Sequence, residues 1–241
     1  MKKKQVKISI TIALFALFAA SCSKPTQTEE HSEEEVVATE EAEPEAEWIP
    51  LPLSKWRNFK KEDVSPIWEE EDGVISLTGK GAGDIITKQK FENFELELEW
   101  KISENGNSGI MYRVVEHDTL GATYHSGPEM QVLDNEGHAD GKIKTHRAGD
   151  NYDMKSCSEE TVKPVGEWNK VRLVINNGKV EHWLNGTMVV DYEFGSPEWE
   201  EQYQNSKFTQ WPQYGQNAVG HIALQDHGDP VWFRNIRIRE L

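Results

Sequence analysis

The chain is poor in cysteine: its 241 residues include only Cys22 and Cys157. The two could pair once, but Cys22 directly follows an apolar N-terminal run, where a processed lipoprotein begins. We therefore expect no disulfide and a free thiol at Cys157. A nucleophilic role for Cys157 is the less economical interpretation, because no pattern around it points to catalysis.

Positive charge is also scarce, since 26 Lys and Arg face 42 Asp and Glu and give a formal net charge of −16. Nucleic-acid binding requires a basic face, so this balance argues against a nucleic-acid partner. Much of the acid is local: ten glutamates and a single lysine, Lys24, lie between Ser23 and Glu47. We expect residues 22–47 to be a disordered, solvated tether.

The chain has no long apolar run beyond residues 8–20, which follow Lys2, Lys3, Lys4 and Lys7. That run is too short to count as a membrane-spanning helix, and it predicts an export signal over residues 1–21. The ending Ala-Ala-Ser-Cys resembles a lipoprotein cleavage site, although Ala19 stands where leucine is common. We expect acyl chains on Cys22 to anchor the protein in a bacterial cell envelope, at the outer membrane or in the periplasm. Cleavage as an ordinary signal peptide is the alternative.

Internal repeats and long amphipathic helices are absent, and short strands take their place. Residues 94–102 alternate apolar and charged side chains, which predicts a strand with one buried face and one wet face that carries Glu95, Glu97 and Glu99. Asn-Gly pairs at 177–178 and 185–186 predict hairpins. Further strands are expected at residues 74–77, 84–87, 108–115, 128–134, 168–175, 179–184, 187–192, 219–225 and 231–239. Many short strands joined by Gly and Asn turns favour an all-β sandwich or jelly roll over residues 48–241.

One predicted strand has an unusual polar face. After Pro128, Met130 and Val132 point to one side, and Glu129 and Gln131 point to the other. We interpret this strand as the wall of a pocket, with His125 at its entry and Asp134 at its exit. Glu129 and Gln131 could instead lie on an exposed outer face, and Asp134 could serve a turn alone.

Two other segments lack sustained periodicity. Residues 135–166 form a long loop rich in His, Arg, Asp and Tyr, and a loop of this length inside a compact domain is usually functional. Residues 195–216 are polar and aromatic, and we expect a short helix and an excursion over the mouth of the sheet. Its aromatic residues are either core-covering side chains or platforms for sugars: Trp199, Trp211 and Tyr214.

Six strings, in order along the chain, resemble the 3-keto-disaccharide hydrolase family over about Trp48 to Leu241. They are Asn107-Ser108-Gly109-Ile110-Met111-Tyr112-Arg113, Glu129-Met130-Gln131-Val132-Leu133-Asp134-Asn135, Gly166-Glu167-Trp168-Asn169, His182-Trp183-Leu184-Asn185-Gly186, Leu224-Gln225-Asp226-His227-Gly228 and Phe233-Arg234-Asn235-Ile236. The resemblance implies a concanavalin-like β-sandwich, often lipid-anchored, in bacteria that degrade glycans. It also implies cleavage of glycosides whose sugar carries a 3-ketone, by lyase and hydratase steps.

Such a ketone acidifies the C2 proton and places the C1 substituent β to the carbonyl. Cleavage then needs a base, a group that stabilises the enolate oxygen and a proton donor for the departing alcohol. We predict Glu129 as the base, with His125 and His146 as candidate proton donors. The predicted substrate-binding residues are Arg113, Gln131, Arg147, Gln225 and His227.

A divalent metal of unknown identity could bridge the C2 hydroxyl and C3 ketone, and no organic cofactor is expected. The expected ligands are His125, Glu129, Asp134 and His146, with His138 and His227 as further donors, but no close-spaced ligand signature is present.

Two alternatives remain open. A non-catalytic carbohydrate-binding module could use the same fold. A laminarinase-type glycosidase would need a paired-carboxylate strand motif, and Gln131 stands where its middle acid belongs.

Overall fold

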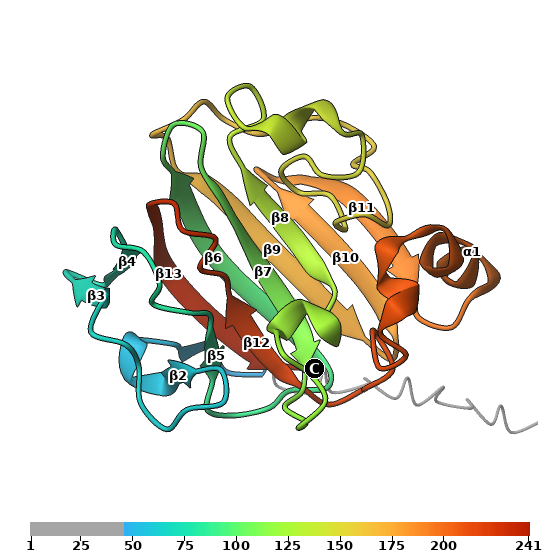
Figure 1. The fold of residues 1–241 in the computed structure, drawn as a ribbon, viewed down its shortest axis with the longest axis horizontal. Coiled ribbons are helices and arrows are strands. Elements are labelled where there is room, and N and C mark those ends of the chain that lie inside the picture. Colours follow the sequence, from blue (N-terminus) through green and yellow to red (C-terminus); the bar gives the residue numbers. More distant parts are fainter. Residues whose placement is uncertain (1–45) are drawn as a thin grey trace, which may run out of the picture. The chain divides into compact units, whose positions relative to one another are not determined.

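Two antiparallel β-sheets pack face to face in residues 46–241, the part of the chain that the computed structural model describes (Figure 1). The predicted β-sandwich is therefore confirmed. The predicted export signal, the lipidation site at Cys22 and nearly all of the acidic tether lie outside the described residues. None of the helices in residues 46–241 has the length and apolarity needed to cross a membrane.

The larger sheet has eight strands. Its order is β11 (Thr187–Glu193), β10 (Lys179–Leu184), β9 (Asn169–Asn176), β6 (Phe94–Ile102), β13 (Val231–Glu240), β4 (Val74–Leu77) and β3 (Trp68–Glu71), with β1 (Ile49–Pro50) also paired to β13. Both predicted Asn-Gly hairpins are present, since Asn177, Gly178, Asn185 and Gly186 all have positive φ.

The smaller sheet has five strands, in the order β2 (Trp56–Asn58), β5 (Ile85–Thr87), β12 (His221–Leu224), β7 (Asn107–Val114) and β8 (Glu129–Leu133). Alternate residues of β8 divide as predicted: Met130 and Val132 belong to the main core between the sheets, and Glu129 and Gln131 lie on the opposite face. Met111 of β7 and Ala223 of β12 share that opposite face in a second, small apolar cluster.

Short helical segments connect the strands. They are the α-helix α1 (Pro197–Asn205) and the 3-10 turns η2 (Thr123–His125), η3 (Ala139–Lys142) and η4 (Lys207–Gln210), with η1 (Leu53–Lys55) near the start of the described chain. Helix α1 begins as its sequence favours: the Ser196 hydroxyl accepts a hydrogen bond from Trp199 N at 3.1 Å, and Pro197 follows the cap.

The outer face of the eight-stranded sheet carries the glutamates of β6, but these are not merely solvated. Glu97 pairs with Arg237 and Glu99 with Arg234, while Glu95 is 3% exposed and pairs with Arg172 and Arg239. The arginines come from the two strands that flank β6. Cross-strand ion pairing therefore explains why this face tolerates three glutamates at alternate positions of one strand.

A buried polar cluster joins the two sheets through the core. The Tyr112 hydroxyl lies 2.8 Å from His182 Nε2 and 2.6 Å from the Tyr192 hydroxyl, and His182 Nδ1 lies 3.0 Å from Gly149 O. Burial lowers the pKa of His182 to about 4, so this side chain is neutral in the folded protein near pH 7.

Candidate active site

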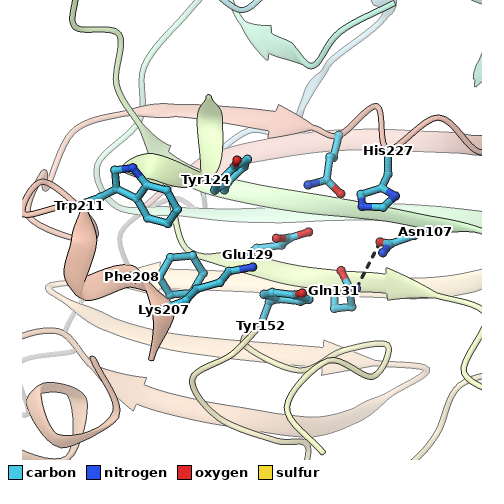
Figure 2. Close-up of a pocket in the computed structure, with 10 residues that line it drawn as sticks. Asn107, Tyr124, Glu129, Gln131, Tyr152, Lys207, Phe208, Trp211 and His227 are labelled. Carbon is cyan, nitrogen blue, oxygen red and sulfur yellow. Dashed lines mark hydrogen bonds between the residues drawn. The ribbon is translucent and has the colours of Figure 1, made fainter. Parts of the chain in front are cut away.

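A cavity of about 260 Å³ opens on the outer face of the five-stranded sheet. Strands β7 and β8 supply its floor, and the surrounding loops, with the segment that follows β12, supply its walls (Figure 2). Six of its ten lining residues are polar or charged and four are aromatic: Asn107, Tyr124, Glu129, Gln131, Tyr152, Lys207, Phe208, Trp211, Gln225 and His227.

The floor is centred on Glu129, which opens strand β8 opposite Met111 of β7. Its side chain extends over Gly109, where a Cβ atom would stand 1.9 Å from Glu129 Oε1. Only glycine therefore leaves room for the carboxyl group in this position. Glu129 is 4% exposed, and this burial raises its pKa to about 8; the Lys207 charge opposes the rise, and Asp84 adds to it.

Amide groups surround the carboxyl group on the sheet. Gln131 Nε2 donates to Asn107 Oδ1 at 3.3 Å. In the opposite orientation of its amide, Gln131 donates instead to Glu129 Oε1 at 3.1 Å and to Ser108 O at 2.9 Å. Gln225 Oε1 is buried, and none of the described residues donates a hydrogen bond to it. This residue of the cavity lining therefore has a hydrogen-bond acceptor without a partner.

Lys207 supplies the positive charge at the cavity. Figure 2 shows its ammonium group directed toward Glu129 and Tyr152, and Nζ lies 4.2 Å from the centroid of the Tyr152 ring. The Tyr152 hydroxyl donates to Asp140 Oδ2 at 3.2 Å. Burial and the nearby acids raise the pKa of Tyr152, which keeps this phenol protonated.

A second layer of residues fixes these two side chains. His146 stacks on Tyr152 with 4.1 Å between ring centroids, and its Nε2 lies 3.1 Å from Asp153 Oδ1. The other carboxylate oxygen of Asp153 accepts a hydrogen bond from the Lys207 backbone N at 2.8 Å. Asp153 thus joins the long loop that carries Tyr152 to the turn that carries Lys207.

The structure brings four of the predicted site residues to the cavity: Glu129, Gln131, Gln225 and His227. The predicted proton donors lie one layer behind its lining. His146 is behind Tyr152, and His125 stacks on Trp211 with 4.3 Å between ring centroids.

The two predicted arginines point elsewhere. The Arg113 guanidinium lies 3.8 Å from the centroid of the Phe194 ring, because Arg113 has a φ of +57° beside a bulge between β7 and β12. Arg147 Nη2 lies 2.6 and 2.7 Å from the two carboxylate oxygens of Glu160, and Arg147 Nη1 donates a hydrogen bond to Gly141 O. Neither arginine lines the cavity.

The predicted metal ligands His125, Glu129, Asp134 and His146 are not brought together. Asp134 serves its turn, since its carboxylate accepts hydrogen bonds from the backbone N atoms of Asn105, Glu136 and Gly137. Within residues 46–241, the ligand atoms that do converge belong to His138, His227 and Asp229 and lie within 4.8 Å of one another.

These three residues suit a divalent ion. His138 Nδ1 already accepts a hydrogen bond from Asp140 N at 3.1 Å, which leaves Nε2 as its available donor atom. Two imidazoles and a carboxylate are the borderline N and O donors that zinc and similar ions accept. His227 also lines the cavity, so an ion here would lie at its edge.

Sequence reasoning did not identify Asn107, Tyr152 or Lys207 as site residues, and it left Trp211 undecided. Lys207 carried a usable signal, because it is the single basic residue between Gly195 and Gln216. Trp199 and Tyr214 are 2% and 0% exposed and belong to the core, whereas Trp211 lines the cavity. Cys157 is half-buried and outside the cavity, and burial raises the pKa of its thiol.

Comparison with known proteins gives a consistent result. Residues 48–239 match the family model described as a 3-keto-alpha-glucoside-1,2-lyase-like domain. The chain is 41% identical over 215 residues to a 3-keto-disaccharide hydrolase of Bacteroides thetaiotaomicron, covering 77% of this chain and 74% of that protein.

Solved structures agree with that match. A candidate glycosyl hydrolase from Parabacteroides distasonis is 34% identical, with a TM-score of 0.74 over 79% of this chain and 90% of that one. A Bacillus subtilis protein with a galectin-like fold is 13% identical, with a TM-score of 0.52 over 80% and 94% of the two chains; this likeness shows the fold alone.

Proposed function

Because the chain belongs to the 3-keto-alpha-glucoside-1,2-lyase-like family, we propose that it cleaves 3-keto-glycosides at the cavity that contains Glu129. One observation carries the assignment: a carboxyl group with a raised pKa lies on the floor of a polar, aromatic-walled cavity. A general base that works near neutral pH needs such a shift, and burial supplies it here.

The proposed reaction begins at C2 of the oxidised sugar. The Glu129 carboxylate takes the C2 proton, and the electron pair moves toward the C3 ketone to form an enolate. When the enolate collapses, a C1–C2 double bond forms and the bond between C1 and the leaving oxygen breaks. Water then adds across the double bond, with its oxygen at C1 and a proton at C2, and releases the free 3-keto-sugar.

Lys207 is the best-placed group to assist the departing oxygen. Its ammonium group reaches the cavity beside Glu129, and an alkoxide that leaves near it gains both electrostatic stabilisation and a proton source. The buried carboxyl group and the nearby ammonium group thus divide the base and acid roles. His125 and His146, the proton donors predicted from the sequence, support Trp211 and Tyr152 instead.

Release of the alcohol from a 3-keto-glucoside tests the proposal. We expect Glu129→Gln to lower kcat by roughly 10²–10⁴-fold, which is the usual contribution of a general base. Glu69→Gln is the matched control, because Glu69 is exposed on β3 far from the cavity lining. Equal activity of Glu129→Gln and the wild type would remove Glu129 as the base. Binding of unoxidised oligosaccharides without any turnover would favour a carbohydrate-binding module.

We also propose that His138, His227 and Asp229 hold a divalent ion, which would supply Lewis-acid stabilisation of an oxyanion when bound. Calorimetric titration with Zn²⁺ and Mn²⁺ tests this. His138→Ala should abolish binding, and the exposed His117, outside the ligand group, gives the matched control His117→Ala. Unchanged ion affinity in His138→Ala would contradict the assignment.

Export and lipid anchoring at Cys22 remain a proposal supported by the N-terminal sequence. The protein would then act on oxidised glycosides at the bacterial cell envelope. Metabolic labelling with a radioactive fatty acid should mark the wild type and leave Cys22→Ser unlabelled, whereas equal labelling of both would contradict lipidation at this residue.

A further inference from the structure

The two ends of the cavity differ in chemistry. Phe208 and Trp211 lie at one end, Asn107 and His227 lie at the other, and Glu129 lies between them (Figure 2). A ligand that fills the cavity therefore meets an apolar surface on one side of the carboxyl group and polar groups on the other side.

The aromatic end is a fixed platform. His125 lies parallel to the Trp211 indole, with an interplanar angle of 17° and 4.3 Å between centroids, and so covers one face of it. Tyr124 meets Trp211 nearly perpendicularly, at 81° and 5.4 Å. With one face covered, only the opposite face of the indole can receive a flat group, and these neighbours hold the ring in place before a ligand arrives.

The polar end requires hydrogen-bond donors. Gln225 Oε1 is buried without a donor partner among the described residues, and a hydroxyl group of a bound sugar would satisfy it. Asn107 and His227 add further polar atoms beside it. An aryl group or an alkyl chain at this end would leave Gln225 Oε1 without a partner, which is costly.

We propose that the oxidised sugar binds at the Asn107–Gln225–His227 end and that the leaving group stacks on Trp211. This orientation rests on the proposed function and adds a substrate class to it. The enzyme prefers 3-keto-glycosides whose leaving group presents a flat apolar face, such as an aryl ring or the apolar face of a second sugar ring. Small alkyl leaving groups are poor substrates because they cannot cover the indole.

The orientation also explains the place of Lys207. Its backbone directly precedes Phe208 in the turn that leads to Trp211, and its ammonium group reaches toward Glu129. The oxygen that joins the sugar to a leaving group on Trp211 would pass between Glu129 and the Lys207 ammonium group. Base and acid would then act on the two sides of C1, at C2 and at the leaving oxygen.

The test compares phenyl and methyl 3-keto-glucosides as substrates of the wild type, Trp211→Ala and Trp211→Phe. Trp232→Ala is the matched control, because Trp232 is also half-buried but lies on the eight-stranded sheet. We expect the wild type, Trp211→Phe and the control to prefer the phenyl glucoside at least about 10-fold in kcat/KM, a typical contribution of an apolar pocket contact. Trp211→Ala should lose that preference, with a fall in kcat/KM of at least about 10-fold more on the phenyl glucoside than on the methyl glucoside.

Calorimetric binding of the unoxidised phenyl and methyl glucosides gives a readout that needs no turnover. If no keto-glucoside is cleaved but Trp211→Ala still loses the phenyl preference in binding, the proposed function fails and the ligand orientation stands. If Trp211→Ala keeps the phenyl preference, or loses both ligands by the same factor, the orientation is overturned. Lack of any phenyl preference in the wild type also overturns it.

Discussion

Replacement of Glu129 by glutamine should stabilise the protein more strongly as the pH rises. The substitution keeps the shape of the side chain and removes its titrating proton. In the wild type, folded Glu129 holds its proton up to a pKa of about 8, whereas a solvated glutamate, as in the unfolded chain, loses it near 4.5. Between these values the folded state binds more protons than the unfolded state, so the free energy of unfolding falls with rising pH. A glutamine at position 129 does not titrate, so it adds no such pH dependence to the free energy of unfolding.

The size of the effect follows from the two pKa values. Each unit of difference corresponds to about 1.4 kcal/mol, and a shift from 4.5 to about 8 spans more than three units. At pH 5 the cost of keeping this group protonated is below about 1 kcal/mol, and at pH 8 it is about 4 kcal/mol. The stability difference between Glu129→Gln and the wild type should therefore grow by roughly 3 kcal/mol from pH 5 to pH 8.

Urea unfolding of the wild type, Glu129→Gln and Glu69→Gln at several values between pH 5 and pH 8 provides the measurement. Other titrating groups are common to the variants and cancel in the difference. The unfolding free energy of the control Glu69→Gln should change with pH as that of the wild type does, because Glu69 is exposed. A difference that stays flat across this range would show that burial does not raise the pKa of Glu129, and the argument for Glu129 as a base near pH 7 would fail with it.

Three other substitutions test the surroundings of Glu129. Asp153→Asn should lower kcat by about 10-fold or more with little change in melting temperature, because it weakens the link that positions Lys207; an unchanged kcat would contradict this positioning role. As the pH falls from 6.5 to about 4, the unfolded wild type protonates His182 while the folded state does not, so the free energy of unfolding should fall by about 3 kcal/mol. His182→Gln should not show this loss. Parallel curves of unfolding free energy against pH for the two proteins, from urea unfolding, would refute this. Gly109→Ala should displace the carboxyl group and cost roughly 10²-fold in kcat/KM, and a crystal structure of the variant with Glu129 unmoved would exclude that cause.

Much of the fold could be predicted because its strands are strongly patterned. Strand β6 alternates over nine residues, and its predicted bounds, 94–102, match the structure. Strands β1, β2 and β3 were missed, since two or three residues are too few for a period, and the run Trp68–Glu71 has three consecutive acids. Pairing with neighbouring strands, which are distant in sequence, determines these short elements.

The candidate site was predictable only where a single strand carries it. The alternation of β8 placed Glu129 and Gln131 on one face correctly. The same logic predicted Arg113 of β7 beside them, but its positive φ and the adjacent bulge turn it toward Phe194. Lys207 enters the cavity from a turn more than seventy residues along the chain from β8, and no local pattern encodes such a contact.

Gly109 offers a way to read other sequences of this type. The Glu129 carboxyl group occupies the volume that a side chain at position 109 would fill, so the two positions form one unit. A related sequence that keeps the glutamate but has any larger residue at the glycine position must place its carboxyl group elsewhere. Its chemistry should then not be inferred from this protein, however similar the remainder of the strand. A missing side chain on one strand is in this way as informative about the reaction as the acid on the next.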